Sequence, residues 1–172
     1  MNDIIKNLTE RRSVRAYDGR PVDDEALDII LKAGEYAPSG MNRQSTVMVA
    51  VRDPETVALL SRLNAKVMGS ENDPFYGAAT VVVVLADPSV VTYVEDGALV
   101  MGNLMNAAHA VNVDSCWIHR AREVFASPEG KALLKKWGVD ESYEGIGNCI
   151  LGYGVGEYPA PRARREGRIV KI

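Results

Sequence analysis

Apolar residues recur along the chain with two different periods, and the period assigns most segments to helices or strands. Helical spacing begins after Pro21, where Asp23 is placed to cap a helix and acidic residues follow in its first turn. Pro38-Ser39-Gly40 ends this helix. Its predicted buried face comprises Ala26, Leu27, Ile30, Ala33 and Ala37. Other helices are predicted at 3–9, 54–68, 91–111 and 128–137.

Short apolar runs rich in β-branched residues predict the strands. The run at 80–86 does not alternate with polar residues, which indicates a strand buried on both faces. Shorter strands are predicted at 46–51, 115–118 and 145–151. Helices alternate with strands, and neither an internal repeat nor a linker interrupts residues 1–172. We therefore expect a single domain of the α+β or α/β class.

The segment 98–111 is unusual because its helix would be apolar on nearly every side. A helix of that kind must be buried on all sides, and in a chain of 172 residues we expect that one layer of neighbouring elements does not bury every side of it. Small residues such as Gly102, Ala107 and Ala110 would let another backbone approach closely. A second subunit is the natural cover, so the pattern favours a homodimer.

Charge and composition narrow the classes of function. The net charge of −3 argues against a general nucleic-acid binder, which usually carries a basic excess. The N-terminus lacks the basic start and long apolar run of a signal peptide, and the longest apolar run, 78–86, is too short to span a bilayer. We therefore expect a cytoplasmic protein without membrane association. Cys116 and Cys149 lie in apolar strand-like segments and are expected to be buried, reduced thiols.

The first segment with candidate chemistry is Arg11-Arg12-Ser13-Val14-Arg15. Arginines this close repel one another unless an anion offsets them, and a guanidinium forms bidentate bonds to phosphate. In an extended conformation, side chains 11, 13 and 15 would share one face and could hold a phosphate and ribityl hydroxyls. The alternative is a solvated basic turn at the C-terminus of a helix, where cations are favourable in any case.

Two further segments have the residue types of a binding site. Asn42 and Gln44, after Pro38-Ser39-Gly40, carry donors and acceptors that can read the edge of a flat heterocycle, although an ordinary turn with local amide bonds is the alternative. The C-terminal arm holds a second cationic cluster that is either a site or a frayed, solvated tail. Its arginines are Arg162, Arg164, Arg165 and Arg168. The last residues, 167–172, are apolar enough to pair as a strand.

Several common motifs are excluded. The glycine-rich stretch 152–157 lacks the third small residue of a dinucleotide loop, and a proline-bearing arm follows it instead of a helix. The sequence contains no Walker-type phosphate loop, no Cys/His metal spacing and no Gly-x-Ser-x-Gly elbow. His109 falls on the buried helix and is interpreted as a packed or interface residue. His119 follows a strand, at an element end where ligands often bind.

Taken in order, these segments resemble the nitroreductase family of flavoproteins. The resemblance extends over almost the whole chain and rests on the ordered set, because each motif alone is weak. The matching stretches are Arg11 to Tyr17 with Pro21-Val22, Ala37 to Gln44, the long helix leading to Ser115-Cys116-Trp117-Ile118, and Ile150 to Tyr153 followed by Pro161 to Arg164. The resemblance implies an α+β fold with a central mixed or antiparallel sheet flanked by helices. It also implies a homodimer whose C-terminal arms are exchanged between subunits.

The same resemblance implies two FMN sites at the subunit interface, and it assigns residues to them. The phosphate, ribityl chain and pyrimidine edge would be held by Arg11, Arg12, Ser13 and Arg15, with Arg162 and Arg164 completing the phosphate site. The other subunit would contribute Pro38, Ser39, Gly40, Asn42 and Gln44. The backbone near Ile118, His119 and Arg120 would approach the reactive N5 edge of the flavin.

The implied reaction is hydride transfer from NAD(P)H to the flavin, followed by reduction of a small acceptor such as a nitroaromatic, a quinone or another flavin in ping-pong fashion. The cofactor carries this chemistry, so no catalytic acid or base and no metal is predicted. Two alternatives stay open: a flavoenzyme of other chemistry on this fold, such as a dehydrogenase or a flavin-cleaving or dehalogenating enzyme, and a non-catalytic FMN-binding or anion-binding regulatory module.

The chain departs from the family pattern in two respects. It is short for the family, and Ser45 and Thr46 stand where members often have a proline and an aromatic residue. Both differences predict a more open pocket beside the flavin ring, which leaves the acceptor undetermined.

Overall fold

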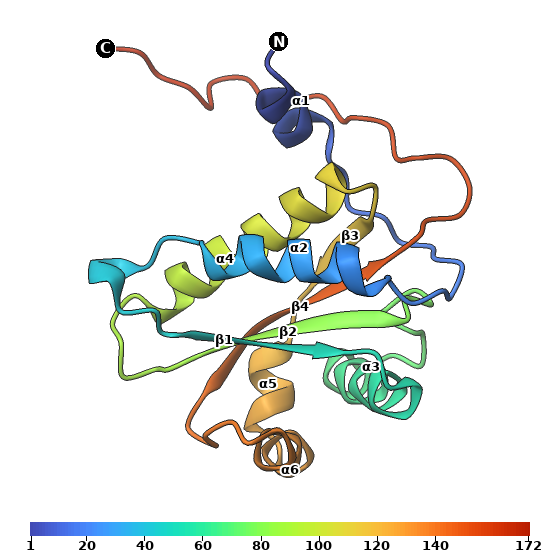
Figure 1. The fold of residues 1–172 in the computed structure, drawn as a ribbon, viewed down its shortest axis with the longest axis vertical. Helices are drawn as coiled ribbons and strands as arrows, with labels where there is room; N and C mark the ends of the chain where they lie inside the picture. The colour runs from blue at the N-terminus through green and yellow to red at the C-terminus, as the bar shows by residue number, and fades with distance from the viewer.

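The computed structural model describes residues 1–172 and contains one four-stranded sheet with the strand order β1-β2-β4-β3 (Figure 1). All neighbouring strands are antiparallel. The strands are β1 (Thr46–Val51), β2 (Thr80–Ala86), β3 (Asp114–Ile118) and β4 (Glu144–Gly152). The predicted α+β class is confirmed, and the sheet is antiparallel rather than mixed.

Helices cover both faces of the sheet and divide the core into two halves (Figure 1). One face carries α2 (Asp24–Glu35) and α4 (Tyr93–Ala110). The other carries α3 (Pro54–Met68), α5 (Ala121–Ala126) and α6 (Pro128–Trp137). Val83 of β2 packs into the half under α3, α5 and α6, and its neighbour Val84 packs into the half under α2 and α4. The strand is therefore buried on both faces, as its unbroken apolar run predicts.

Local capping explains where most helices begin and end. The side chain of Asp23 accepts a hydrogen bond from the amide of Ala26 at the start of α2, and Asp53 does the same for Thr56 in α3. Gly69, in a left-handed conformation, ends α3. The helix α5 gives no sequence signal and was not predicted, because it has six residues and no capping side chain at its start.

The helix α4 is less completely buried than its apolar sequence predicts. Leu104 is fully buried in the core of its own chain, whereas Leu99, on the outer side, stays 46% exposed. Asn103 is accommodated because it donates a hydrogen bond to the carbonyl of Ala33, at 2.8 Å. The outer side of α4 nevertheless lacks a cover within one chain, so the expected second subunit stays a prediction.

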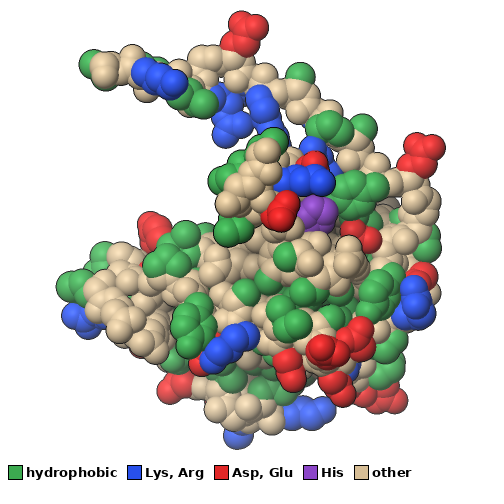
Figure 2. All heavy atoms as spheres, turned by 45° about the horizontal axis from the view of Figure 1, so that its top comes forward, with side chains coloured by type: hydrophobic (Ala, Val, Ile, Leu, Met, Phe, Trp, Pro, Cys, Tyr) green, Lys and Arg blue, Asp and Glu red, His purple; other side chains and the backbone are tan.

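Both ends of the chain leave apolar side chains in solvent. The helix α1 (Asp3–Glu10) has no buried residue, and Ile4, Ile5 and Leu8 are exposed. The arm from Pro159 onward stands away from the body (Figures 1 and 2). Figure 1 shows that it passes α1 and that the C-terminus lies beyond that helix. The predicted strand at 167–172 is not formed within a single chain, where it has no free partner strand beside it. None of the helices has the length and apolarity that a membrane crossing requires.

Candidate functional site

The arginine-rich segment after α1 runs extended beside the edge strand β3. Ser13 forms a parallel bridge with Ser115, and the amide of Val14 donates a hydrogen bond to the carbonyl of Ser115 at 3.1 Å. Val14 is buried in the core, while Arg15 is exposed and Ser13 is half-buried. The alternation of a strand holds at residues 13–15 but not beyond them, because Ala16 is exposed and Tyr17 is buried again. The side chains of Ser13 and Arg15 therefore lie on the side facing away from the core.

Arg11 and Arg12 have different environments. The Nη1 atom of Arg11 is buried and has no hydrogen-bond partner in the chain. Arg12 instead turns back to α1, where its Nη1 donates to the carbonyls of Thr9 at 2.7 Å and Arg11 at 2.8 Å. A buried cationic donor without an acceptor is costly, so Arg11 is the better placed of the two to bind an anion.

The start of the C-terminal arm returns to this arginine segment. Val155 donates its amide to the carbonyl of Ala16 at 3.1 Å, and Arg12 donates its amide to the Tyr158 hydroxyl at 2.7 Å. Arg12, Tyr158 and Pro161 line one cavity of about 540 Å³. The arm therefore contacts the arginine segment as far as Pro161, and Arg162 and Arg164, which follow, are exposed.

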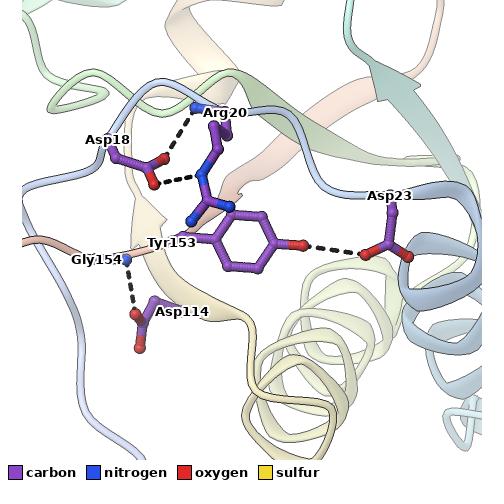
Figure 3. Close-up of polar contacts among 6 residues, drawn as sticks. All are labelled: Asp18, Arg20, Asp23, Asp114, Tyr153 and Gly154. Atoms are coloured by element: carbon purple, nitrogen blue, oxygen red, sulfur yellow. Dashed lines mark hydrogen bonds and ion pairs between the residues drawn. The ribbon is translucent and has the colours of Figure 1, made fainter.

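A set of polar contacts braces the turn between these two segments (Figure 3). The Tyr153 hydroxyl donates to Asp23 at 3.1 Å, and the amide of Gly154 donates to Asp114 at 2.9 Å. The Arg20 guanidinium lies 4.6 Å from the centre of the Tyr153 ring. Partial burial, and then the hydrogen bond to Asp23, raises the pKa of Tyr153. The glycine-rich stretch 152–157 thus has a bracing role here, consistent with its rejection as a dinucleotide loop.

The other end of β3 carries the predicted Ile118, His119 and Arg120. Ile118 is buried, His119 is exposed, and Arg120 adopts a left-handed conformation with φ of 74°. The carbonyl of His119 accepts a hydrogen bond from Asn64 Nδ2 at 2.7 Å. Asn64 is fully buried in α3, and its Oδ1 has no partner. Sequence reasoning did not assign Asn64 a role, although a lone amide among the apolar positions of α3 was a usable signal.

A small cavity of about 240 Å³ opens beside this strand end. The indole of Trp117 forms one wall and fits because residue 147 is glycine, where a Cβ would stand 2.4 Å from Trp117 Nε1. Arg122 at the rim is paired with Glu144 at 3.2 Å. The remaining lining is Val94, Ala98, His119, Glu123, Gly145 and Ile146. A flat aromatic wall with polar groups at the rim suits a planar ligand.

The predicted amide segment forms a strained loop between α2 and β1. Met41, Asn42 and Gln44 have positive φ values of 51°, 53° and 50°. Together with Arg120, they make four of the six non-glycine residues with positive φ in the chain. Such conformations are uncommon and cluster at functional sites, so both segments are site candidates on geometry alone.

One chain does not bring all predicted site residues together. The loop holding Gly40, Asn42 and Gln44 lies at one end of α2, and the Arg11–Arg15 segment lies towards the opposite end of the molecule (Figure 1). The side chains of this loop are largely exposed, and Gln44 Nε2 donates to Asn42 Oδ1 at 3.2 Å. Within the chain, no cluster of three His, Cys, Asp or Glu residues is arranged to hold a metal ion.

The chain is similar to known proteins over its full length. The model of the nitroreductase family matches residues 8–75. A protein of Archaeoglobus fulgidus, provisionally named an NADH dehydrogenase/NAD(P)H nitroreductase, is 31% identical over 159 residues, which are 89% of this chain and 86% of that protein.

Solved structures of similar proteins extend this likeness to the fold. A nitroreductase with bound FMN from Bacteroides fragilis has a TM-score of 0.92 and 29% identity, covering 100% of both chains. A second nitroreductase with bound FMN, from Desulfitobacterium hafniense, has a TM-score of 0.89 and 26% identity, covering 100% of this chain and 99% of that one.

Proposed function

The chain belongs to the nitroreductase family, and from that premise we propose that it binds FMN and uses it to oxidise NAD(P)H and reduce a small acceptor. The observation that carries the proposal is the arginine segment, which runs extended along β3 and leaves a buried donor of Arg11 without an acceptor in the chain. A phosphate is an anion that would satisfy that donor.

The residues of this chain fit an FMN at both ends of β3. At the first end, Arg11, Ser13 and Arg15 would hold the phosphate and ribityl chain, with Arg12 beside them. Arg162 and Arg164 would complete this end from the arm, since Pro161 already lines the same cavity as Arg12. The negative charge of the phosphate would reduce the mutual repulsion of these five guanidinium groups.

At the second end, Ile118, His119 and Arg120 would face the reactive edge of the ring with backbone groups. The left-handed conformation of Arg120 exposes backbone at a strand end, and Asn64 supports it through the carbonyl of His119. Backbone N–H groups directed at a developing negative charge stabilise it without reorganisation. Asn64 is itself fully buried, so its support acts through the backbone and not through direct contact with the ring.

The remaining assigned residues would come from a second copy of the chain. The strained loop that contains Pro38, Ser39, Gly40, Asn42 and Gln44 rests on α4 through Gly40 and leaves the side chains of residues 41–44 exposed. The outer side of α4 and the apolar tail 167–172 likewise lack a cover. A homodimer with shared sites and exchanged arms would account for all three features.

When bound, FMN would supply the two-electron chemistry, accepting hydride from NAD(P)H and returning electrons to an acceptor such as a nitroaromatic or a quinone. The chain would bind the cofactor, orient both substrates on it in turn and restrict water at the ring. The cavity beside Trp117 offers an aromatic wall to a planar ring. No side-chain acid or base is assigned.

The test is to mix the purified protein with FMN at low micromolar concentration and follow flavin absorbance, flavin fluorescence and NAD(P)H oxidation. We expect quenched flavin fluorescence. With oxygen excluded, we also expect NADH or NADPH consumption that continues beyond reduction of the FMN only while a nitroaromatic or quinone is supplied. Tight FMN binding without NAD(P)H oxidation would replace this function by a binding module or by other flavin chemistry. The absence of FMN binding would overturn the proposal.

A further inference from the structure

Asp96 is a buried carboxylate that holds the strained loop at 40–45. It lies in the first turn of α4, is only 2% exposed and forms no salt bridge. Its Oδ1 accepts the amide N–H of Gly40 at 2.9 Å. Its Oδ2 accepts the hydroxyls of Ser45 at 2.8 Å and Thr92 at 3.2 Å. The carboxylate therefore ties both ends of the loop to α4.

The loop needs such an anchor. Left-handed conformations at Met41, Asn42 and Gln44 cost free energy and persist only where the surroundings enforce them. Gly40 packs tightly, because a Cβ there would stand 2.3 Å from the Thr92 hydroxyl oxygen. The exposed side chains of the loop make only local contacts, and short-range hydrogen bonds such as Gln44 N–H to Ser39 Oγ shape its interior. Asp96 is the side chain that links both ends of the loop to α4.

A carboxylate strengthens this anchor because its charge assists all three hydrogen bonds that it accepts. An asparagine could keep its Oδ1 on the amide of Gly40 and turn its NH2 group towards the hydroxyls of Ser45 and Thr92, which can also accept. The amide would therefore keep the geometry of the anchor but remove the charge from its hydrogen bonds. The position at the N-terminal turn of α4 compensates for the missing cation, because the helix dipole favours negative charge there.

We infer that Asp96 is a positioning residue that presents the loop 40–44 to an FMN held by the arginine segment of the other chain. This inference rests on the proposed function, since it requires FMN and a dimer. Asp96 itself touches no cofactor. Its effect passes through the loop to a site that its own chain does not complete.

The first experiment compares Asp96→Asn with Asp140→Asn. Asp140 accepts one backbone hydrogen bond, from Ser142, in the turn before β4, so it is a matched control away from the loop. We expect Asp96→Asn to weaken FMN affinity by about tenfold, because the hydrogen bonds that hold the loop lose their charge assistance. We also expect faster tryptic cleavage after the exposed Arg43 in the FMN-free protein. Asp140→Asn should change neither.

The second experiment tests whether Asp96 acts on the partner's site. Two differently tagged chains, one Asp96→Asn and the other Arg11→Ala, are co-expressed and the mixed dimer is isolated by tandem affinity steps. One of its sites combines the intact Arg11 of the first chain with the intact loop of the second, and the other site has both defects. We expect the mixed dimer to bind about half the FMN of the wild type with wild-type affinity, while each variant homodimer binds weakly at both sites.

The outcomes separate the inference from the function. A mixed dimer without a tight site, or an Asp96→Asn protein with wild-type affinity and cleavage rate, would overturn the inference while wild-type FMN binding keeps the function. Wild-type protein that binds no FMN would overturn both. A weak Asp96→Asn homodimer together with a half-loaded mixed dimer supports the assignment across the interface, which a general folding defect would not produce.

Discussion

Replacing Arg11 by methionine should affect FMN binding and apo-protein stability in opposite directions. Methionine keeps an unbranched apolar side chain and removes the guanidinium, whose Nη1 is buried without an acceptor. The buried, unpaired donor destabilises the FMN-free protein, and the same donor would bind the FMN phosphate. Replacing a residue retained for packing alone would instead lower the stability of the FMN-free protein.

The magnitudes follow from the state of that one group. Loss of a charge-assisted hydrogen bond costs about 1.5–3 kcal/mol, which corresponds to a loss of affinity of roughly ten- to a hundredfold. Leaving a buried donor unsatisfied costs about 1–3 kcal/mol in the FMN-free protein, and its removal relieves that cost. Arg11→Met should therefore unfold at the same or a higher denaturant concentration than the wild-type apo-protein.

The assay is a fluorescence titration with FMN at fixed ionic strength, paired with urea unfolding of the FMN-free protein. Arg62→Met, on the exposed surface of α3, is the matched control and should leave FMN affinity unchanged. Unchanged FMN affinity in Arg11→Met would favour the alternative interpretation, in which the arginine segment is a solvated basic turn. Affinity and apo-protein stability that fall together would show a structural role instead.

Three further outcomes follow from particular contacts. Leu99→Glu, on the uncovered side of α4, should yield monomers and lose FMN binding together, as sedimentation and titration would show, whereas retention of the dimer would remove α4 from the interface. Gly147→Ala would place a Cβ 2.4 Å from Trp117 Nε1 and should lower the thermal midpoint by overpacking, at a cost of about 1–3 kcal/mol; an unchanged midpoint would contradict the indole position. Burial, followed by the charge of Cys116, raises the pKa of the Cys149 thiol from 9.0 to about 12. Between these two pKa values the folded chain keeps a proton that the unfolded chain loses, so the free energy of unfolding falls as the pH rises from 9.0 to about 12. In urea titrations at each pH, Cys149→Ala should make that decline less steep. An equally steep decline in the variant would show that other groups cause it.

Most of the fold could be predicted because local signals and burial agree. The unbroken β-branched run of 80–86 indicated a strand buried on both faces, and Asp23 and Gly138 mark a helix start and a helix end by their caps. The helix α5 carries no such signal at its start. The periodicity of α4 overstated its burial, because period alone cannot distinguish a residue such as Leu104 in the core of its own chain from Leu99 on an uncovered side.

The candidate site was only partly readable from the sequence. The arginine segment could be found from its charge, and the loop at 38–44 from its turn residues. The hydrogen bonds of Asn64 and Asp96 depend on a strand end and a loop that are distant in sequence, 55 and 51–56 residues away. Tertiary contacts of that kind leave only a weak local signal: Asn64 is an amide among apolar positions, and Asp96 follows another acidic residue in the first turn of its helix.

Native mass spectrometry of the FMN-reconstituted protein tests the shared site most directly, because it counts chains and cofactors in the same particle. We expect one dominant species that contains two chains and two FMN molecules, and we expect it to release FMN when the chains separate. A single chain that retains FMN, or a dimer that takes up none, would contradict a cofactor site built from the arginine segment of one chain and the strained loop of the other.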